Sequence, residues 1–218
     1  MYLKYLYICA LGLCSIAGVI SIQKLTKQLK VIALLCFYTF ILEFSVVFFK
    51  KEISYEGNVL PQYNFFVFLE FMFYAYFFKQ IIKNRHVSKV INCFLLIFPL
   101  LWYMFTFYCF NILEWNSYSF VLGGTFVIFF ALIYCYELLT RDETTLLLTE
   151  AEFWIAIGLI IFYTCEVPYM GMYRYLSVHY MQLAVKLKNL NLVTNIIMYS
   201  LFAYAFICST IRIKRFYL

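Results

Sequence analysis

The sequence predicts an all-α integral membrane protein, on three observations. Of its 218 residues, 66% are hydrophobic and only 13% are charged, whereas about a quarter of the residues in soluble globular domains are charged. Apolar runs of about 20 residues recur along the chain, which is the length that an α-helix needs to cross a bilayer core of about 30 Å. The runs are unbroken, whereas a membrane β-barrel would show segments of about ten residues with alternating polarity. The same composition excludes a soluble or a disordered chain.

Seven runs have this length, and we treat residues 1–218 as one membrane domain built from them. They are Tyr5–Ile22, Val31–Phe49, Pro61–Ile82, Val90–Ile112, Ser117–Tyr136, Phe153–Tyr173 and Leu190–Ile211. The first is expected to be a retained helix rather than a cleaved signal peptide, because three lysines follow it and no small-residue cleavage site stands out. The sixth follows a capping-box pattern, Thr149 to Glu152, which predicts a helix start near residue 150. The second, third and sixth runs each enclose one glutamate, and the other four carry no charge.

Lysine and arginine residues set the expected orientation, because cytoplasmic loops retain them preferentially. The tail and the loops after the first, third and fifth runs hold 11 of them: Lys24, Lys27, Lys30, Lys79, Lys83, Arg85, Lys89, Arg141, Arg212, Lys214 and Arg215. The opposite side holds 6: Lys4, Lys50, Lys51, Arg174, Lys186 and Lys188. The sequence therefore predicts seven transmembrane helices with the N-terminus outside and the C-terminus inside.

Three glutamates inside the predicted helices are the candidate functional residues, since an ionisable group within a membrane span costs about 2.5 to 3.5 kcal/mol on insertion scales. At 1.5 Å per residue, Glu43, Glu70 and Glu166 fall at one depth in the outer half of the bilayer. The same arithmetic places three polar residues close to that plane, namely Asn195, Tyr103 and Thr125. One interpretation is an outward-facing pocket that binds a proton, a cation or a cationic ligand. The alternative is that each glutamate is protonated and bonded to a neighbouring helix, which holds the bundle together.

A proline and a weak repeat add two further expectations. Pro168 follows Glu166 closely, and a proline inside a helix frees a backbone carbonyl and can form a hinge. Termination of the helix is the alternative. The strings Phe37–Thr39 and Phe162–Thr164 precede Glu43 and Glu166, which suggests a weak repeat of three helices, one linker helix and three helices, as some transporters have.

Cysteine, histidine and charge patterns predict no catalytic or metal site. All 8 cysteines fall within predicted helices, form no C-x-x-C pair and are expected to be packing residues. His86 and His179 are both placed in loops, so no metal-binding pair and no histidine base beside a nucleophile is predicted. The net charge of +6 indicates basic loops beside anionic lipid rather than nucleic-acid binding. Gly123 and Gly124 are expected to allow close packing of two helices.

Several short strings resemble a known membrane module. They are Phe153–Ile155 with Gly158, Phe162 and Tyr163; Asn191 with Asn195–Leu201 and Phe206–Cys208; and Asn64 with Leu69–Phe71. Together they resemble the seven-helix membrane module of Bacteroidetes-type bacteria, which is similar to the sensory portion of sensor histidine kinases. The resemblance implies no ligand and no functional residue. The printed chain continues for only seven residues after Ile211, so we expect no kinase domain in it.

These observations predict a non-enzymatic, multi-pass sensor or receptor-like subunit in a bacterial inner membrane, without a cofactor. It would relay a cue to a separate partner such as a histidine kinase or another membrane subunit, because its predicted loops are too short to hold a catalytic domain. A small secondary transporter or proton-coupled carrier is the first alternative, since buried glutamates and a proline-broken helix occur in such carriers. A structural subunit of a membrane complex is the second.

Overall fold

The computed structural model of the protein describes residues 2–55, 57–109, 111–140 and 147–216. Within these ranges the chain is all-α, with the helices α1 (Tyr2–Ser21), α2 (Lys27–Phe48), α3 (Lys50–Ile53), α4 (Leu60–Ile81), α5 (Arg85–Met104), α6 (Ser117–Leu139), α7 (Ala151–His179) and α8 (Met181–Phe216). A π-helical turn, η1 (Phe105–Cys109), continues α5, and a 3₁₀ turn, η2 (Leu147–Thr149), precedes α7. The predicted fold class is thus confirmed as far as all-α.

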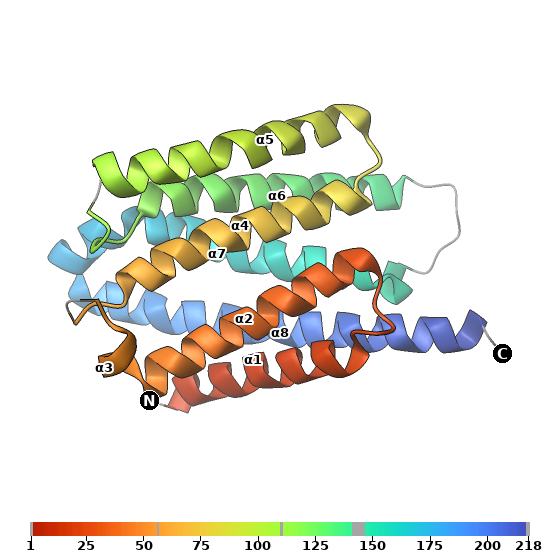
Figure 1. Ribbon diagram of the computed structural model, residues 1–218, viewed down its shortest axis with the longest axis horizontal. Coiled ribbons are helices and arrows are strands. Elements are labelled where there is room, and N and C mark those ends of the chain that lie inside the picture. The colour runs from red at the N-terminus through yellow and green to blue at the C-terminus, as the bar shows by residue number, and fades with distance from the viewer. Residues whose placement is uncertain (1, 56, 110, 141–146, 217–218) are drawn as a thin grey trace.

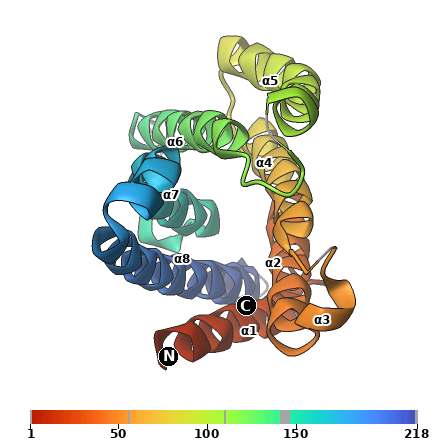
Figure 2. The same ribbon diagram turned by 90° about the vertical axis from the view of Figure 1, so that its left-hand side faces the viewer.

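Six of the long helices form a closed ring. α1 packs on α2, α2 on α4, α4 on α6, α6 on α7 and α7 on α8, which returns to α1. α5 lies outside this ring and packs mainly on α4 (Figure 2). Successive long helices run in opposite directions, so that α1 begins at one end of the bundle and α8 ends at the other (Figure 1). We call these the N-terminal end and the C-terminal end of the bundle.

Six helices are long and apolar enough to cross a membrane, namely α1, α2, α5 with η1, α6, α7 and α8 up to Thr210. The chain is therefore a multi-pass membrane protein. The third predicted span forms as α4, which has 22 residues but is too polar to qualify by composition. Gln62, Asn64 and Glu70 lower its mean hydropathy, and two of them, Asn64 and Glu70, are buried against other helices instead of facing lipid.

The predicted loop between the sixth and seventh runs is wrong. α7 continues to His179 and α8 begins at Met181, so that only Tyr180 separates them. The two helices extend about 43 and 54 Å at 1.5 Å per residue, which exceeds a bilayer core of about 30 Å. Charges at Arg174, Lys186 and Lys188 end an apolar run, but they do not end a helix. The extension has its own small core of Tyr169, Leu176 and Ala184.

The fourth predicted span is shifted toward the N-terminus of the chain. α5 begins at Arg85 because the side-chain oxygen of Asn84 accepts hydrogen bonds from the backbone N–H groups of His86 (2.9 Å) and Val87 (3.4 Å). His86 therefore lies in the first turn of α5 and His179 ends α7, so both histidines are in helices, contrary to the prediction. The regular helix ends at Met104, and Phe110 of the predicted span lies outside the described residues.

The predicted start of the sixth helix near residue 150 is confirmed, but Thr149 is not its N-cap residue. Glu150 occupies the N-cap position and α7 begins at Ala151. Glu152 turns away from the helix start, and its Oε1 accepts hydrogen bonds from Gln28 at 3.2 Å and Thr26 at 3.5 Å. The carboxylate thereby connects α7 to the beginning of α2. Arg141 and the side chains of Arg212, Lys214 and Arg215, which entered the orientation count, lie outside the described residues.

The paired glycines of α6 allow two close helix contacts, as predicted. A Cβ atom at Gly123 would overlap the ring of Phe71 on α4. A Cβ atom at Gly124 would lie 2.6 Å from Val167 Cγ2 and 2.9 Å from Tyr163 Cδ1, both on α7. α6 can therefore pack closely on α4 and on α7 at the same level of the ring.

The order of the helices agrees with three helices, one linker helix and three helices, since three long helices of the ring precede α5 and three follow it. The residue strings that suggested a repeat are not in equivalent places, however. Tyr38 of the first string is 36% exposed, whereas Tyr163 of the second is fully buried. The match between the strings therefore gives no support to a transporter-like internal repeat.

Candidate functional site

Glu70 lies in the interior of the ring, on the face of α4 that is turned away from α5. Its side chain interacts with two buried phenols, Tyr74 one turn along α4 and Tyr163 on α7. The rings of these tyrosines meet edge to face, with centroids 6.1 Å apart. Tyr199 of α8 is also an electrostatic neighbour of Glu70. A carboxyl group is thus held among tyrosines from three different helices.

Glu166 of α7 is the second buried carboxyl group, with 1% of its surface exposed. It interacts with the side chain of Asn191 on α8 and lies within electrostatic range of Glu70. Asn191 in turn accepts a hydrogen bond from Asn195 Nδ2 at 3.2 Å through its side-chain oxygen, and another at 3.0 Å through its carbonyl. Glu166 Oε2 is buried without a hydrogen-bond partner among the described residues, as is the hydroxyl of Tyr163.

Glu43 of α2 is half-buried and lies nearer the N-terminal end of the bundle. Its Oε1 accepts a hydrogen bond from the hydroxyl of Tyr63 at 3.2 Å. It also interacts with Tyr7 and with Lys4, both on α1. The ring of Tyr7 lies 6.1 Å from that of Tyr199, so Tyr7 connects Glu43 with the group around Glu70.

We call these side chains the interior polar cluster. Its members are Tyr7, Glu43, Tyr63, Glu70, Tyr74, Tyr163, Glu166, Asn191, Asn195 and Tyr199. Four of the predicted site residues, Glu43, Glu70, Glu166 and Asn195, belong to this cluster. The cluster draws on α1, α2, α4, α7 and α8, which are five of the six helices of the ring.

The other predicted site residues lie elsewhere. Tyr103 of α5 is 51% exposed and packs on Phe107, with ring centroids 4.8 Å apart. Thr125 of α6 is exposed, and its hydroxyl donates to the carbonyl of Val121 in its own helix at 2.7 Å. Pro168 lies inside α7, which continues for a further 11 residues to His179, so the proline does not terminate the helix.

The interior polar cluster is closed toward the C-terminal end of the bundle. Large apolar side chains fill the ring there, and Phe77, Phe78, Ile155, Phe202 and Phe206 are each 0% exposed. Glu43, in contrast, is only half-buried and has Lys4 as a neighbour at the N-terminal end. The least buried members of the cluster, Glu43, Tyr63 and Asn191, thus lie toward the N-terminal end of the bundle.

Sequence reasoning missed the tyrosines that surround the carboxyl groups. Their helical spacing could have identified two of them, since Tyr74 lies four residues after Glu70 and Tyr163 lies three residues before Glu166. Such pairs share one face of a helix. Tyr7 and Tyr199 carry no such signal, because they meet the cluster only through the packing of α1 and α8.

Tight packing limits what the cluster can take up. Glu70 and Glu166 are buried among aromatic rings, so a proton or a small cation fits the arrangement better than an organic ligand. Within the described part of the chain, no group of three or more His, Cys, Asp and Glu side chains is placed to hold a metal ion. All eight cysteines are free thiols.

Comparisons with protein-family models, with curated proteins and with solved structures find no match for this chain. The resemblance to the seven-helix sensory module therefore stays a prediction. The functional argument rests on the geometry of the interior polar cluster.

Proposed function

We propose that the protein is a non-enzymatic membrane sensor in which the interior polar cluster takes up a proton or a small cation and α8 passes the change to a separate partner. One observation carries the proposal: the cluster approaches one end of the bundle through Glu43 and is closed toward the other by apolar side chains. A carrier must expose its site to both sides of the membrane in turn. A site with access from one side suits detection better than transport.

α8 provides the route from the cluster to the partner. It contributes Asn191 and Tyr199 to the cluster and has 36 residues, which correspond to about 54 Å. In Figure 1 its last turns extend past the neighbouring helices at the C-terminal end of the bundle. A change of charge at Glu166 would act directly on Asn191, and α8 would carry the resulting displacement to the far side of the membrane. A histidine kinase or another membrane subunit is the kind of partner that we propose there.

The proposal includes a topology of seven spans with the N-terminus outside. α4 is counted as a span because it has 22 residues and takes part in the ring. The excess of lysine and arginine favours a C-terminal end that lies inside. A membrane-impermeant maleimide should label Cys109, which is exposed in η1 at the N-terminal end, in intact cells. A cysteine introduced by His86→Cys at the other end should react only after the membrane is opened. The reverse pattern would invert the topology.

The sensor proposal is tested by partner capture. The tagged protein is cross-linked mildly in its host's membranes at two external pH values, and the accompanying proteins are quantified by mass spectrometry. We expect a stoichiometric partner whose amount changes with pH. In Glu70→Gln and Glu166→Gln the amount of partner should no longer depend on pH, because glutamine resembles a neutral glutamate and cannot ionise.

The matched control is Glu52→Gln, which removes an exposed carboxylate from α3 outside the cluster. It should respond to pH as the wild type does. Wild-type behaviour of Glu70→Gln and Glu166→Gln would contradict the role of the cluster. A pH-dependent flux in proteoliposomes that Glu166→Gln abolishes would contradict the sensor proposal and favour a transporter.

A further inference from the structure

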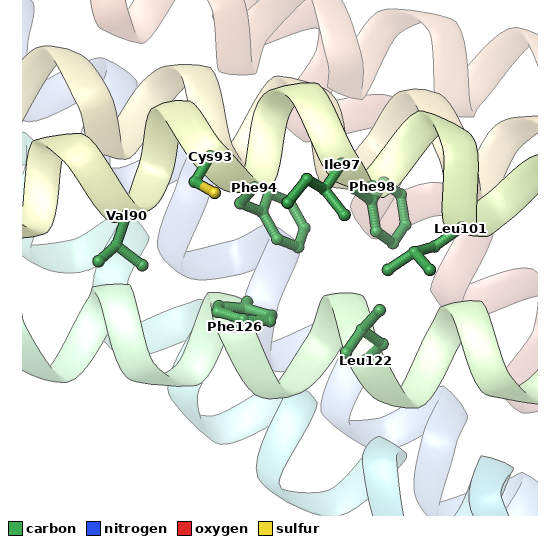
Figure 3. Close-up of a pocket in the computed structure, with 8 residues that line it drawn as sticks. All are labelled: Val90, Cys93, Phe94, Ile97, Phe98, Leu101, Leu122 and Phe126. Atoms are coloured by element: carbon green, nitrogen blue, oxygen red, sulfur yellow. The ribbon is translucent and has the colours of Figure 1, made fainter.

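A groove runs between α5 and α6 on the outside of the ring. It has a volume of about 190 Å³ and is lined by Val90, Cys93, Phe94, Ile97, Phe98 and Leu101 of α5 and by Leu122 and Phe126 of α6. Figure 3 shows the α5 side chains directed toward the two side chains of α6. Val90 and Ile97 are 42% and 46% exposed, so the groove opens to the surroundings of the bundle.

The lining excludes water and favours a hydrocarbon occupant. None of the eight side chains offers an oxygen or nitrogen atom, and a water molecule needs two to four polar partners. An apolar cavity of about 150 Å³ stays dry and takes up benzene. A groove of this size therefore accommodates part of an alkyl chain, and it is too narrow for the helix of another protein, which is about 10 Å across.

The length of the groove matches one leaflet of a bilayer. Val90 and Leu101 are 11 residues apart in α5, which corresponds to about 16 Å along the helix. Half of a hydrocarbon core of about 30 Å is about 15 Å. The groove follows the helix axis, as the acyl chain of a lipid in that leaflet does.

Four exposed cations lie at the end of the groove that Val90 marks. Lys79, Lys83, Arg85 and Lys89 surround the turn between α4 and α5. Within the described residues no ion pair engages them. The nearby carboxylate of Glu137 is occupied by the backbone N–H groups of Lys83 (2.9 Å) and Asn84 (3.0 Å). With four cations and this one carboxylate, the described part of the turn carries a net positive charge where a lipid headgroup would lie.

We infer that the groove binds one acyl chain of an anionic phospholipid, with its phosphate held by the basic turn between α4 and α5. The apolar lining takes the chain, and Arg85 and Lys89 select the headgroup by charge. Each Lys or Arg near an anionic lipid surface contributes about a fivefold gain in affinity. The site lies outside the ring and is independent of the sensor proposal.

Cys93 reports occupancy of the groove directly. The purified protein in detergent is alkylated with N-ethylmaleimide in the presence of phosphatidylglycerol or phosphatidylcholine, and the modification of each cysteine is followed by peptide mass spectrometry. Phosphatidylglycerol should slow the modification of Cys93 at least fivefold, and phosphatidylcholine should slow it much less. Cys9, which is exposed on α1, is the internal control and should be unaffected. Absence of protection by either lipid would overturn the site, and equal protection by both would overturn its selectivity.

Two sets of variants distinguish binding of the lipid's acyl chain from binding of its headgroup. Cys93→Phe fills the groove and should abolish the one-to-one lipid adduct in native mass spectrometry, whereas Cys9→Phe makes the same change on another exposed surface and should retain it. Arg85→Gln with Lys89→Gln should reduce the preference for phosphatidylglycerol by at least tenfold, and Lys50→Gln with Lys51→Gln at the opposite end should not. If Cys93→Phe keeps the adduct, or if instead it dissociates a dimer of the wild type, the groove is not a lipid site.

Discussion

Asn64 of α4 fixes the segment between α5 and α6 by accepting a hydrogen bond from the backbone N–H of Asn116 to its Oδ1 at 3.1 Å. Its Nδ2 donates to the carbonyls of Ile112 (3.1 Å) and Glu114 (2.8 Å). The Asn116 side chain in turn donates to the hydroxyl of Thr106 at 2.7 Å. A single buried amide therefore holds the connection that brings the chain from the outlying α5 back into the ring.

Asn64→Ala should destabilise the protein strongly. The substitution removes three hydrogen bonds, and one of them leaves the buried N–H of Asn116 unpaired, which alone costs about 1 to 3 kcal/mol. We expect a total loss of about 2 to 4 kcal/mol in the free energy of unfolding. Thermal denaturation in detergent would report it as a lower melting temperature. Asn111→Ala is the control, because its side chain accepts a local hydrogen bond from the N–H of Leu113, at 3.2 Å on the surface. Equal losses in the two variants would argue against a special role for Asn64.

Gly123→Ala should destabilise the contact between α6 and α4. The added methyl group would overlap the fully buried ring of Phe71, and overpacking of this kind costs about 1 to 3 kcal/mol. Gly171→Ala offers a matched comparison in α7, because the nearest atom to its Cβ would be Val121 Cγ2 at 3.3 Å. That variant should be neutral or gain up to about 1 kcal/mol from the higher helix propensity of alanine. The melting temperatures of the two variants in the same detergent decide between these expectations.

The sequence predicted the long helices because length and apolarity depend on local composition alone. The prediction failed where polar residues lie within a helix. The stretch around Arg174 and Lys186 is too polar for a membrane core, but it remains helical to His179 and from Met181 onward. Conversely, α4 is a helix of the expected length that carries Asn64 and Glu70 inside the protein.

The facing of side chains could not be predicted, because the interior and the lipid-facing surface have the same chemistry here. Phe77 is fully buried and Phe65 is 47% exposed in the same helix. The rise per residue therefore placed Tyr103 and Glu70 at one depth in the bilayer, but it could not show that α5 lies outside the ring. In a membrane the apolar residues of a helix need not gather on one face. The hydrophobic periodicity therefore does not indicate which face of the helix packs inside the protein.

A double-mutant cycle should measure the bond between Tyr63 and Glu43. Tyr63→Phe and Glu43→Leu each remove one partner, and the coupling between them should be about 0.6 to 1.7 kcal/mol, the range for hydrogen bonds between membrane helices. Unfolding free energies of the two single variants and the double variant, measured in micelles, provide the value. Tyr38→Phe combined with Glu43→Leu is the control cycle, since the ring of Tyr38 stacks on Phe66, 6.1 Å away. Coupling of the same size in both cycles would mean that the hydrogen bond is not its source.

Pro168→Ala tests whether the proline is a hinge in α7. Pro168 has no N–H to donate to the carbonyl of Thr164, four residues earlier, and alanine would restore that hydrogen bond. Pro99 breaks the same kind of bond inside α5, outside the ring. Pro168→Ala and Pro99→Ala should therefore both raise the melting temperature in detergent.

The two proline variants should differ in function. Pro168 lies two residues from Glu166, so a stiffened α7 should weaken the pH-dependent change in partner capture, whereas a stiffened α5 should leave that change as in the wild type. If both variants respond to pH as the wild type does, α7 transmits no bending motion and the signal must pass through the side-chain contact between Glu166 and Asn191. If both lose the response, rigidity of the whole bundle rather than a hinge at Pro168 is the cause.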